Sequence, residues 1–196
     1  MSGEINICNS ALIKIGVTPI VSFTDNVKSA QVCNLLYPVI RDELLSFHYW
    51  NFAMRRKELA LLSTTPEFGL PYEFQLPADC IRVRTVQSND ITFKIEGRKL
   101  LADSEIIQIQ YISNETDPSQ FSPQFKEAIS SRLAANLAYS MTASRGLSKD
   151  LFDYSVIQLR DARSADGQEG IQDELEQDIW LESRYIGAGR IGNVEV

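Results

Sequence analysis

The sequence has few of the residues from which metal centres and thiol enzymes are built. Its 196 residues include one histidine, His48, and three cysteines. The cysteines are widely spaced within apolar stretches, and neither a CxxC pair nor a Cys/His cluster occurs, so we expect no metal site and no cofactor. Such surroundings favour reduced thiols, and we predict that Cys8, Cys33 and Cys80 are buried and unpaired.

Long apolar runs and an excess of positive charge are also missing. No apolar run approaches the roughly 18 residues that a membrane span needs, so we expect none, and the first residues do not have the pattern of a secretory signal. The chain has 19 basic and 26 acidic residues, a formal net charge of −7. This balance argues against a protein that binds nucleic acid by neutralising phosphates along a basic surface.

Catalytic motifs are lacking as well. There is no GxSxG motif, and His48, although it follows Asp42 and Glu43, has no signalled nucleophile to activate. The GAGRIG stretch at 187–192 resembles GxGxxG but no strand pattern precedes it. The acidic cluster within 173–178 lacks the glycine and terminal glutamate of an EF-hand loop, so a solvated helix face is the simpler interpretation. We therefore predict that the chain is not an enzyme.

Apolar residues at helical spacing predict four helices, two on each side of a central region. Gly16 suits a left-handed end to the first helix, and Ser122 followed by Pro123 is typical of a helix start. Proline removes a helical donor, so we expect a kink or break at Pro38. The expected helices are residues 3–15, a helix from about Thr24 or Asp25 that resumes after Pro38 towards Leu62, a helix from Pro123 that ends at Gly146, and residues 147–165.

The central region changes to a period of two. Two prolines and a glycine within 63–71 indicate a boundary, and alternating segments then predict four short strands, at 72–76, 81–86, 93–96 and 106–112. They predict a small antiparallel module with one wet face, on which Arg82 and Arg84 lie. The fold class is therefore α+β: a helical bundle domain of residues 1–62 and 113–165, an inserted β module of residues 63–112, and a C-terminal arm of residues 166–196.

Aromatic residues are concentrated between the second helix and the β module. His48, Tyr49, Trp50 and Phe52 are too dense for a solvated loop, so we predict a packed helix end or corner in which Trp50 and Phe52 join the two layers. Arg55 and Arg56 follow and are free to form ion pairs with a neighbouring subunit. We expect Arg41, His48, Trp50, Asn51 and Phe52 to have a structural role in this stretch and no catalytic one.

The C-terminal arm begins with a glycine-containing break at 166–170. Apolar residues follow that are unfavourable to leave in water, and aromatic residues are favoured anchors at partner surfaces. We predict that the arm binds a partner, and packing back on its own domain stays the alternative. The expected anchors are Ile179, Trp180, Leu181, Tyr185 and Ile186.

Taken together, several segments resemble the tail tubular protein A family of short-tailed bacteriophages over roughly residues 4–170. They are RDELLSFHYWNFAMRRKELAL, YEFQLPADCIRV, FKIEGRKLLAD, QIQYI, FKEAISSRLAANLAYSMTAS and DARSADGQEG. In that family the residues at 48–53 usually read His-Pro-Trp-Asn-Phe-Ala. Tyr49 stands here where proline is common, which affects the backbone of the corner and no catalytic role.

The resemblance implies a structural virion protein at the junction of head and tail, assembled in the host cytoplasm. Such an adaptor forms a homo-oligomeric ring, expected to be a dodecamer, between the phage portal protein and the tail nozzle protein. Genome DNA passes through the ring without specific binding, and an acidic channel wall would keep it from adhering. The alternatives are a virion-associated hydrolase that uses His48 and a DNA-binding module.

Overall fold

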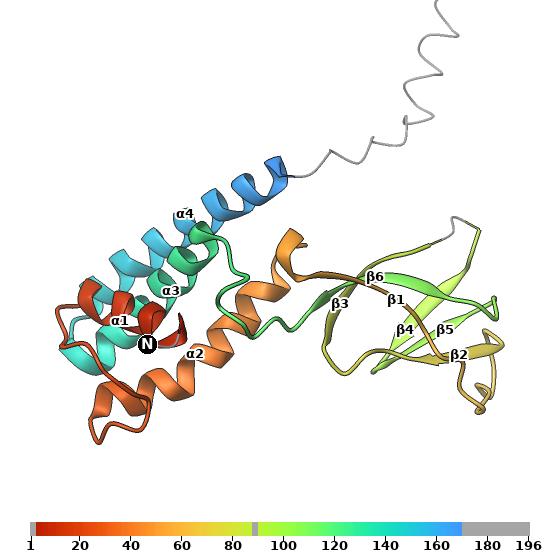
Figure 1. Cartoon of the computed structure of the whole chain (residues 1–196), viewed down its shortest axis with the longest axis horizontal. Helices are drawn as coiled ribbons and strands as arrows, with labels where there is room; N and C mark the ends of the chain where they lie inside the picture. Colours follow the sequence, from red (N-terminus) through yellow and green to blue (C-terminus); the bar gives the residue numbers. More distant parts are fainter. Residues whose placement is uncertain (1–2, 88–89, 170–196) are drawn as a thin grey trace, which may run out of the picture.

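The computed structural model describes residues 3–87 and 90–169, which form an α+β fold of four α-helices and six strands (Figure 1). The helices gather at one end of an elongated molecule and the strands at the other. In chain order the elements are α1 (Gly3–Lys14), α2 (Lys28–Ser46), the 3-10 turn η1 (Asn51–Ala53), β1 (Met54–Glu58), β2 (Tyr72–Gln75), β3 (Cys80–Val86), β4 (Phe93–Glu96), β5 (Lys99–Ala102), β6 (Gln108–Ser113), α3 (Pro123–Thr142) and α4 (Arg145–Gln168).

Helix α3 lies among the other three helices and contacts each of them. Its start is as predicted: the Ser122 hydroxyl accepts a hydrogen bond from the Phe125 N–H at 3.2 Å, and Pro123 occupies the first turn, where a missing N–H removes no helical bond. Because neighbours cover it on several sides, even Ser130 and Ser131 are buried.

Two helices end elsewhere than expected. Helix α2 has no break at Pro38, because the buried Tyr37 and Ile40 hold both halves against the core, and it ends at Ser46 and does not continue towards Leu62. Helix α3 ends at Thr142, one turn before Gly146, and Ala143 takes the left-handed conformation with φ of 55°. Its N–H still bonds to the Tyr139 carbonyl at 3.0 Å, so the end is satisfied without glycine.

Helix α4 is longer than predicted at both ends. It starts at Arg145, after Ser144 as N-cap, and continues through Asp166 and Gly167 to Gln168, where a flexible break was expected. Ala162 and Asp166, four residues apart on one face, are both buried. Their burial against the rest of the protein supports the last turn of the helix.

The strands form two antiparallel sheets of three, in the orders β1-β6-β3 and β2-β5-β4. The expected helix through residues 54–62 is wrong, because β1 occupies Met54–Glu58 and pairs with β6, Met54 opposite Ile112. The strand β5 was not expected either, although Gly97 provides the predicted turn before it. Edge strand β1 gains its backbone hydrogen bonds only from a partner far along the chain.

The buried side chains divide into two clusters, one for each end of the molecule. The helical cluster includes Trp50, Phe125 and Leu133, and the β cluster includes Phe74 and Leu100. Strand β6 contributes to both, because Ile112 belongs to the helical cluster and Tyr111 to the β cluster. The three cysteines are buried and free, as predicted.

Candidate functional site

The aromatic corner, residues 47–53, joins α2 to β1 and is centred on Trp50. The Trp50 side chain is fully buried, and its indole Nε1 donates a hydrogen bond to the Leu44 carbonyl at 2.9 Å. That carbonyl lies in the last turn of α2 and also accepts from the Phe47 N–H at 3.3 Å. The indole therefore adds a second donor at the helix end and helps to fix the direction in which the chain leaves it.

Further aromatic rings connect the corner to α3. The ring centroids of Trp50 and Phe125 lie 4.6 Å apart, and those of Phe52 and Phe125 lie 5.0 Å apart. Phe121, which precedes α3, lies 5.5 Å from Phe52. Rings at these separations add to stability beyond the apolar area they bury. The helical layer and the start of β1 are thus held by the same cluster.

The last turn of α4 is bonded to this corner through Asp166. The backbone N–H of Asn51 donates to Oδ1 and Oδ2 of Asp166 at 3.1 and 3.2 Å, and Asn51 Nδ2 donates to the Asp166 carbonyl at 2.7 Å. The His48 imidazole Nε2 lies 3.2 Å from Asp166 Oδ2. Asp166 is 4% exposed, so its carboxylate depends on these donors in place of water.

Burial controls the titration of this pair. It lowers the pKa of His48 below the ordinary value of 6.5, and the positive charges of Arg163 and Arg84 act in the same direction, whereas Asp166 opposes them. Burial raises the pKa of Asp166, against the stabilising hydrogen bonds from Asn51 and His48. A neutral imidazole beside a hydrogen-bonded carboxylate is therefore the form expected at neutral pH.

Two arginines of β3 surround the neighbouring ring of Tyr49. The guanidinium carbon of Arg82 lies 4.7 Å from the Tyr49 ring centroid and that of Arg84 lies 5.8 Å from it. Both separations are within the range of cation–π attraction. Tyr49, which stands where the resembled family usually has proline, therefore attracts both arginines to the corner.

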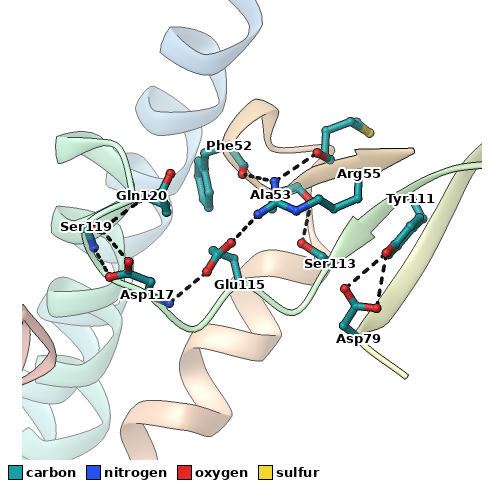
Figure 2. Close-up of polar contacts among 11 residues, drawn as sticks. Phe52, Ala53, Arg55, Asp79, Tyr111, Ser113, Glu115, Asp117, Ser119 and Gln120 are labelled. Atoms are coloured by element: carbon teal, nitrogen blue, oxygen red, sulfur yellow. Dashed lines mark hydrogen bonds and ion pairs between the residues drawn. The ribbon is translucent and has the colours of Figure 1, made fainter. Parts of the chain in front are cut away.

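The opposite flank of the corner carries a second set of polar contacts (Figure 2). Arg55 Nη2 lies 2.7 Å from Glu115 Oε2, and Figure 2 shows the two side chains facing each other between β1 and the segment after β6. The Ser113 hydroxyl donates to the Ala53 carbonyl at 2.9 Å. These contacts fix the start of β1, and they assign Arg55 a partner within its own chain.

The residues singled out from the sequence do not form one site. Arg55 and Arg82 lie on opposite faces of their sheet, because Arg55 is opposite Tyr111 and Arg82 is opposite Ile112, the next residue of β6. Arg56 is exposed on β1. Arg41 is buried and forms an ion pair of 2.8 Å with Asp42. The arm residues Ile179, Trp180, Leu181, Tyr185 and Ile186 lie outside the described residues.

The contact of Asp166 with the corner was not predicted from the sequence. The available signal was its position four residues after Ala162, on the stripe of α4 that faces the core. The adjoining glycine and polar residues favoured a break instead. Its partners Asn51 and His48 lie more than a hundred positions earlier, and no local pattern reports such a contact.

The described residues around His48 include neither a partnered nucleophile nor a set of metal ligands. Within residues 3–87 and 90–169, His48 makes no hydrogen bond to a serine, threonine or cysteine side chain, and no three potential metal ligands converge. In the same part of the chain, no helix combines the length and the apolar character needed to cross a membrane.

Comparisons with protein-family models and with curated proteins find no significant match to this chain.

Proposed function

We propose that this protein is the head-to-tail adaptor of a short-tailed bacteriophage, a structural virion protein that joins the portal to the tail nozzle. The observation that carries the proposal is the resemblance of six sequence segments to the tail tubular protein A family. These segments include the aromatic corner, most of the strands, most of α3 and the last turns of α4. The resemblance thus extends over both ends of the molecule.

In this proposal the four helices are one bundle domain that forms the body of a ring subunit, and the sheets are a module inserted into it. The chain order supports this division, because α1 and α2 precede the strands and α3 and α4 follow them. The module would face the nozzle or a neighbouring subunit, with Arg82 and Arg84 on the contacting face. Twelve acidic subunits would line a channel through which DNA passes without adhering.

The decisive measurement is the mass of the assembled species. Purified protein is analysed by native mass spectrometry alone and with assembled portal, and a ring of about twelve copies is expected on the portal. Portal that binds no copies of the protein, or single copies only, would contradict the adaptor function.

Substitutions in the C-terminal arm test the contact between this protein and the portal or a neighbouring subunit. If Trp180 and Tyr185 anchor the arm on a neighbour or on the portal, the double variant Trp180→Ala/Tyr185→Ala weakens portal attachment. Gln172→Ala/Gln177→Ala is the matched control, because it alters two residues of the same segment without removing an aromatic ring or a charge. Equal attachment by the two variants would exclude the aromatic residues as anchors.

The His48 and Asp166 pair is the one observation that favours a hydrolase as the second candidate. A carboxylate that orients an imidazole is part of a catalytic triad, but here the same carboxylate also accepts from the Asn51 backbone and so has a structural use. His48→Gln keeps a polar side chain at the corner. Virions that carry it and remain infectious would exclude the hydrolase.

A further inference from the structure

Helix α4 lies along one edge of the helical end and packs against α3 (Figure 1). Ser155 and Ala162 are buried on its inner side, and two stripes of residues at helical spacing run along its exposed sides. The basic stripe consists of Lys149, Phe152, Val156 and Arg160. The acidic stripe consists of Asp150, Tyr154, Ile157 and Asp161.

The two stripes have the same order of chemistry. Each begins with a charged residue, continues with two apolar residues that are 41% to 51% exposed, and ends with a charge of the same sign as the first. Each member of the acidic stripe follows its counterpart in the basic stripe by one or two positions. The stripes therefore lie at the same level of the helix, roughly 100° apart around its axis.

The charged ends of both stripes are open to solvent. Within residues 3–87 and 90–169, the side chains of Lys149 and Asp150 form no hydrogen bond and no ion pair, and both residues are exposed. In the same ranges Arg160 and Asp161 are paired only with each other, 4.0 Å apart, and their side chains are 82% and 59% exposed. An exposed pair of this kind contributes little, so all four charges can take partners from another chain.

We propose that the basic stripe of one copy of this chain binds the acidic stripe of a second copy, with the two α4 helices parallel and side by side. Lys149 then meets Asp150 of the second copy, Arg160 meets Asp161, and the apolar residues pack between these ion pairs. A two-fold axis across the helices would instead place each stripe against itself, Lys149 against Arg160, and like charges would repel. The contact is therefore heterologous, and each copy keeps one stripe for a further neighbour.

The surface beside the basic stripe is hollowed. The hollow has a volume of about 400 Å³ and is lined by Tyr139, Arg145, Ser148, Lys149 and Phe152. Aromatic walls with positive charges suit an aromatic side chain that carries a hydroxyl group. Side chains of a helix lean towards its N-terminus, so Tyr154 of the second copy is placed to enter this hollow.

A heterologous contact that repeats either closes into a ring or continues as a filament. The proposal deepens the adaptor function, on which the ring rests, by naming the surface that joins adjacent subunits. One pair of helices buries less area than a stable dimer interface needs, so two copies should associate weakly and gain stability when each uses both stripes.

Charge reversal of one stripe at a time tests the pairing in the full-length protein. Lys149→Glu/Arg160→Glu makes both stripes acidic, and Asp150→Lys/Asp161→Lys makes both basic. Each variant alone should self-associate with a dissociation constant about tenfold higher than that of the unaltered protein. An equal mixture of the two variants should recover the association, because acidic and basic chains can alternate. Sedimentation velocity over a series of protein concentrations is the measurement.

Lys57→Glu/Lys94→Glu is the matched control, because it changes the net charge as much as the acidic variant does, at two exposed positions in the sheets. It should associate like the unaltered protein. A mixture that associates no better than its components would overturn the proposal, and so would an unaltered protein that stays monomeric at every concentration. Portal attachment is measured separately, so either result would leave the adaptor function to its own test.

Disulfide formation tests the orientation of the two helices. Val156→Cys and Ile157→Cys place thiols at the centres of the two stripes, and the cysteines of the unaltered chain are buried. Oxidation of an equal mixture should yield mainly disulfides between the two variants. Disulfides mainly between like variants would overturn the proposal in favour of a two-fold contact. A yield no higher than that from Val156→Cys mixed with Gln31→Cys, at an exposed position on α2, would overturn it altogether.

Discussion

Asp166 shows how a single buried carboxylate connects parts of the chain that are distant in sequence. Its oxygens accept from the Asn51 backbone, and its carbonyl accepts from the Asn51 side chain. A residue in this position stabilises the fold less through its charge than through the donors that it satisfies. Removing its carboxylate leaves the part-buried Asn51 N–H and the His48 imidazole without this acceptor.

We therefore expect Asp166→Ala to lower the free energy of unfolding by about 1–3 kcal/mol. Urea unfolding followed by circular dichroism measures this change. Asp161→Ala, on an exposed position of the same helix, is the control and should alter stability by no more than about 0.5 kcal/mol. Similar effects of the two substitutions would show that the bonds from the Asn51 N–H to the Asp166 carboxylate are not important for stability.

His48 makes the free energy of unfolding depend on pH, because its pKa differs between the folded and the unfolded chain. Its pKa in the folded protein lies below the unfolded value of 6.5, so the unfolded chain binds more protons as the pH falls. The stability contributed by His48 is present above pH 6.5 and is lost as the pH falls through its folded pKa. Asp166, whose pKa is raised, contributes the opposite dependence.

The titration of His48 can be observed directly, because the chain has no other histidine. We expect the imidazole resonance in the NMR spectrum to titrate with a midpoint below 6.5. Asp166→Asn removes the charge that opposes this shift and should lower the midpoint further. A midpoint above 6.5 in the unaltered protein would mean that the ion pair with Asp166 outweighs burial.

At the scale of elements, α2 contains a residue that disfavours helix. Pro38 cannot donate to the Asn34 carbonyl four residues earlier, and a proline in a helix interior costs about 3 kcal/mol relative to alanine. The helix nevertheless continues, because α2 buries Cys33, Tyr37 and Ile40 against α1 and α3. Tertiary packing thus outweighs local preference here.

We expect Pro38→Ala to raise the free energy of unfolding by about 1 kcal/mol, since the new N–H can complete the helical bond while some packing of the ring is lost. Urea unfolding is the measurement. Gln31→Ala, at an exposed position on α2, should change stability by no more than about 0.5 kcal/mol. A loss of stability in Pro38→Ala would indicate that the packing of the proline ring contributes more free energy than the restored hydrogen bond.

For the whole molecule, the two apolar clusters imply two regions of different local stability. Phe74 belongs to the β cluster and Leu133 to the helical cluster, and strand β6 connects them. Regions with separate cores often open separately. The aromatic corner and β6 are then the parts through which one region supports the other.

We expect Phe74→Ala to destabilise the β region by about 3–5 kcal/mol and to leave most of the helical region protected. Hydrogen exchange followed by mass spectrometry should show faster exchange in β2 and β5 and little change in α1 and α3. Phe93→Ala is the control, because Phe93 lies on β4 of the same sheet but is 42% exposed. Equally accelerated exchange in α3 would show that the molecule opens as one unit.

Local patterns in the sequence account for the α+β class and for several individual features. The Ser122 and Pro123 start of α3, the left-handed Gly16 and the buried cysteines were all predicted and are present. Each depends on the chemistry of one residue or on a short repeat. Capping groups, left-handed glycines and apolar stripes act over one or two turns, so their signals are complete within a short stretch of sequence.

The tertiary structure decided what depends on distant partners. Residues 54–58 became strand β1 because β6 offers backbone partners fifty or more positions later. Helix α4 continued through Asp166 because Asn51 and His48 hold its last turn. The ion pair of Arg55 with Glu115 and the contact of Arg82 with the Tyr49 ring likewise exist only in the folded chain. A single sequence reports local preference, whereas the free energy gained by long-range hydrogen bonds and burial exists only once the chain has folded.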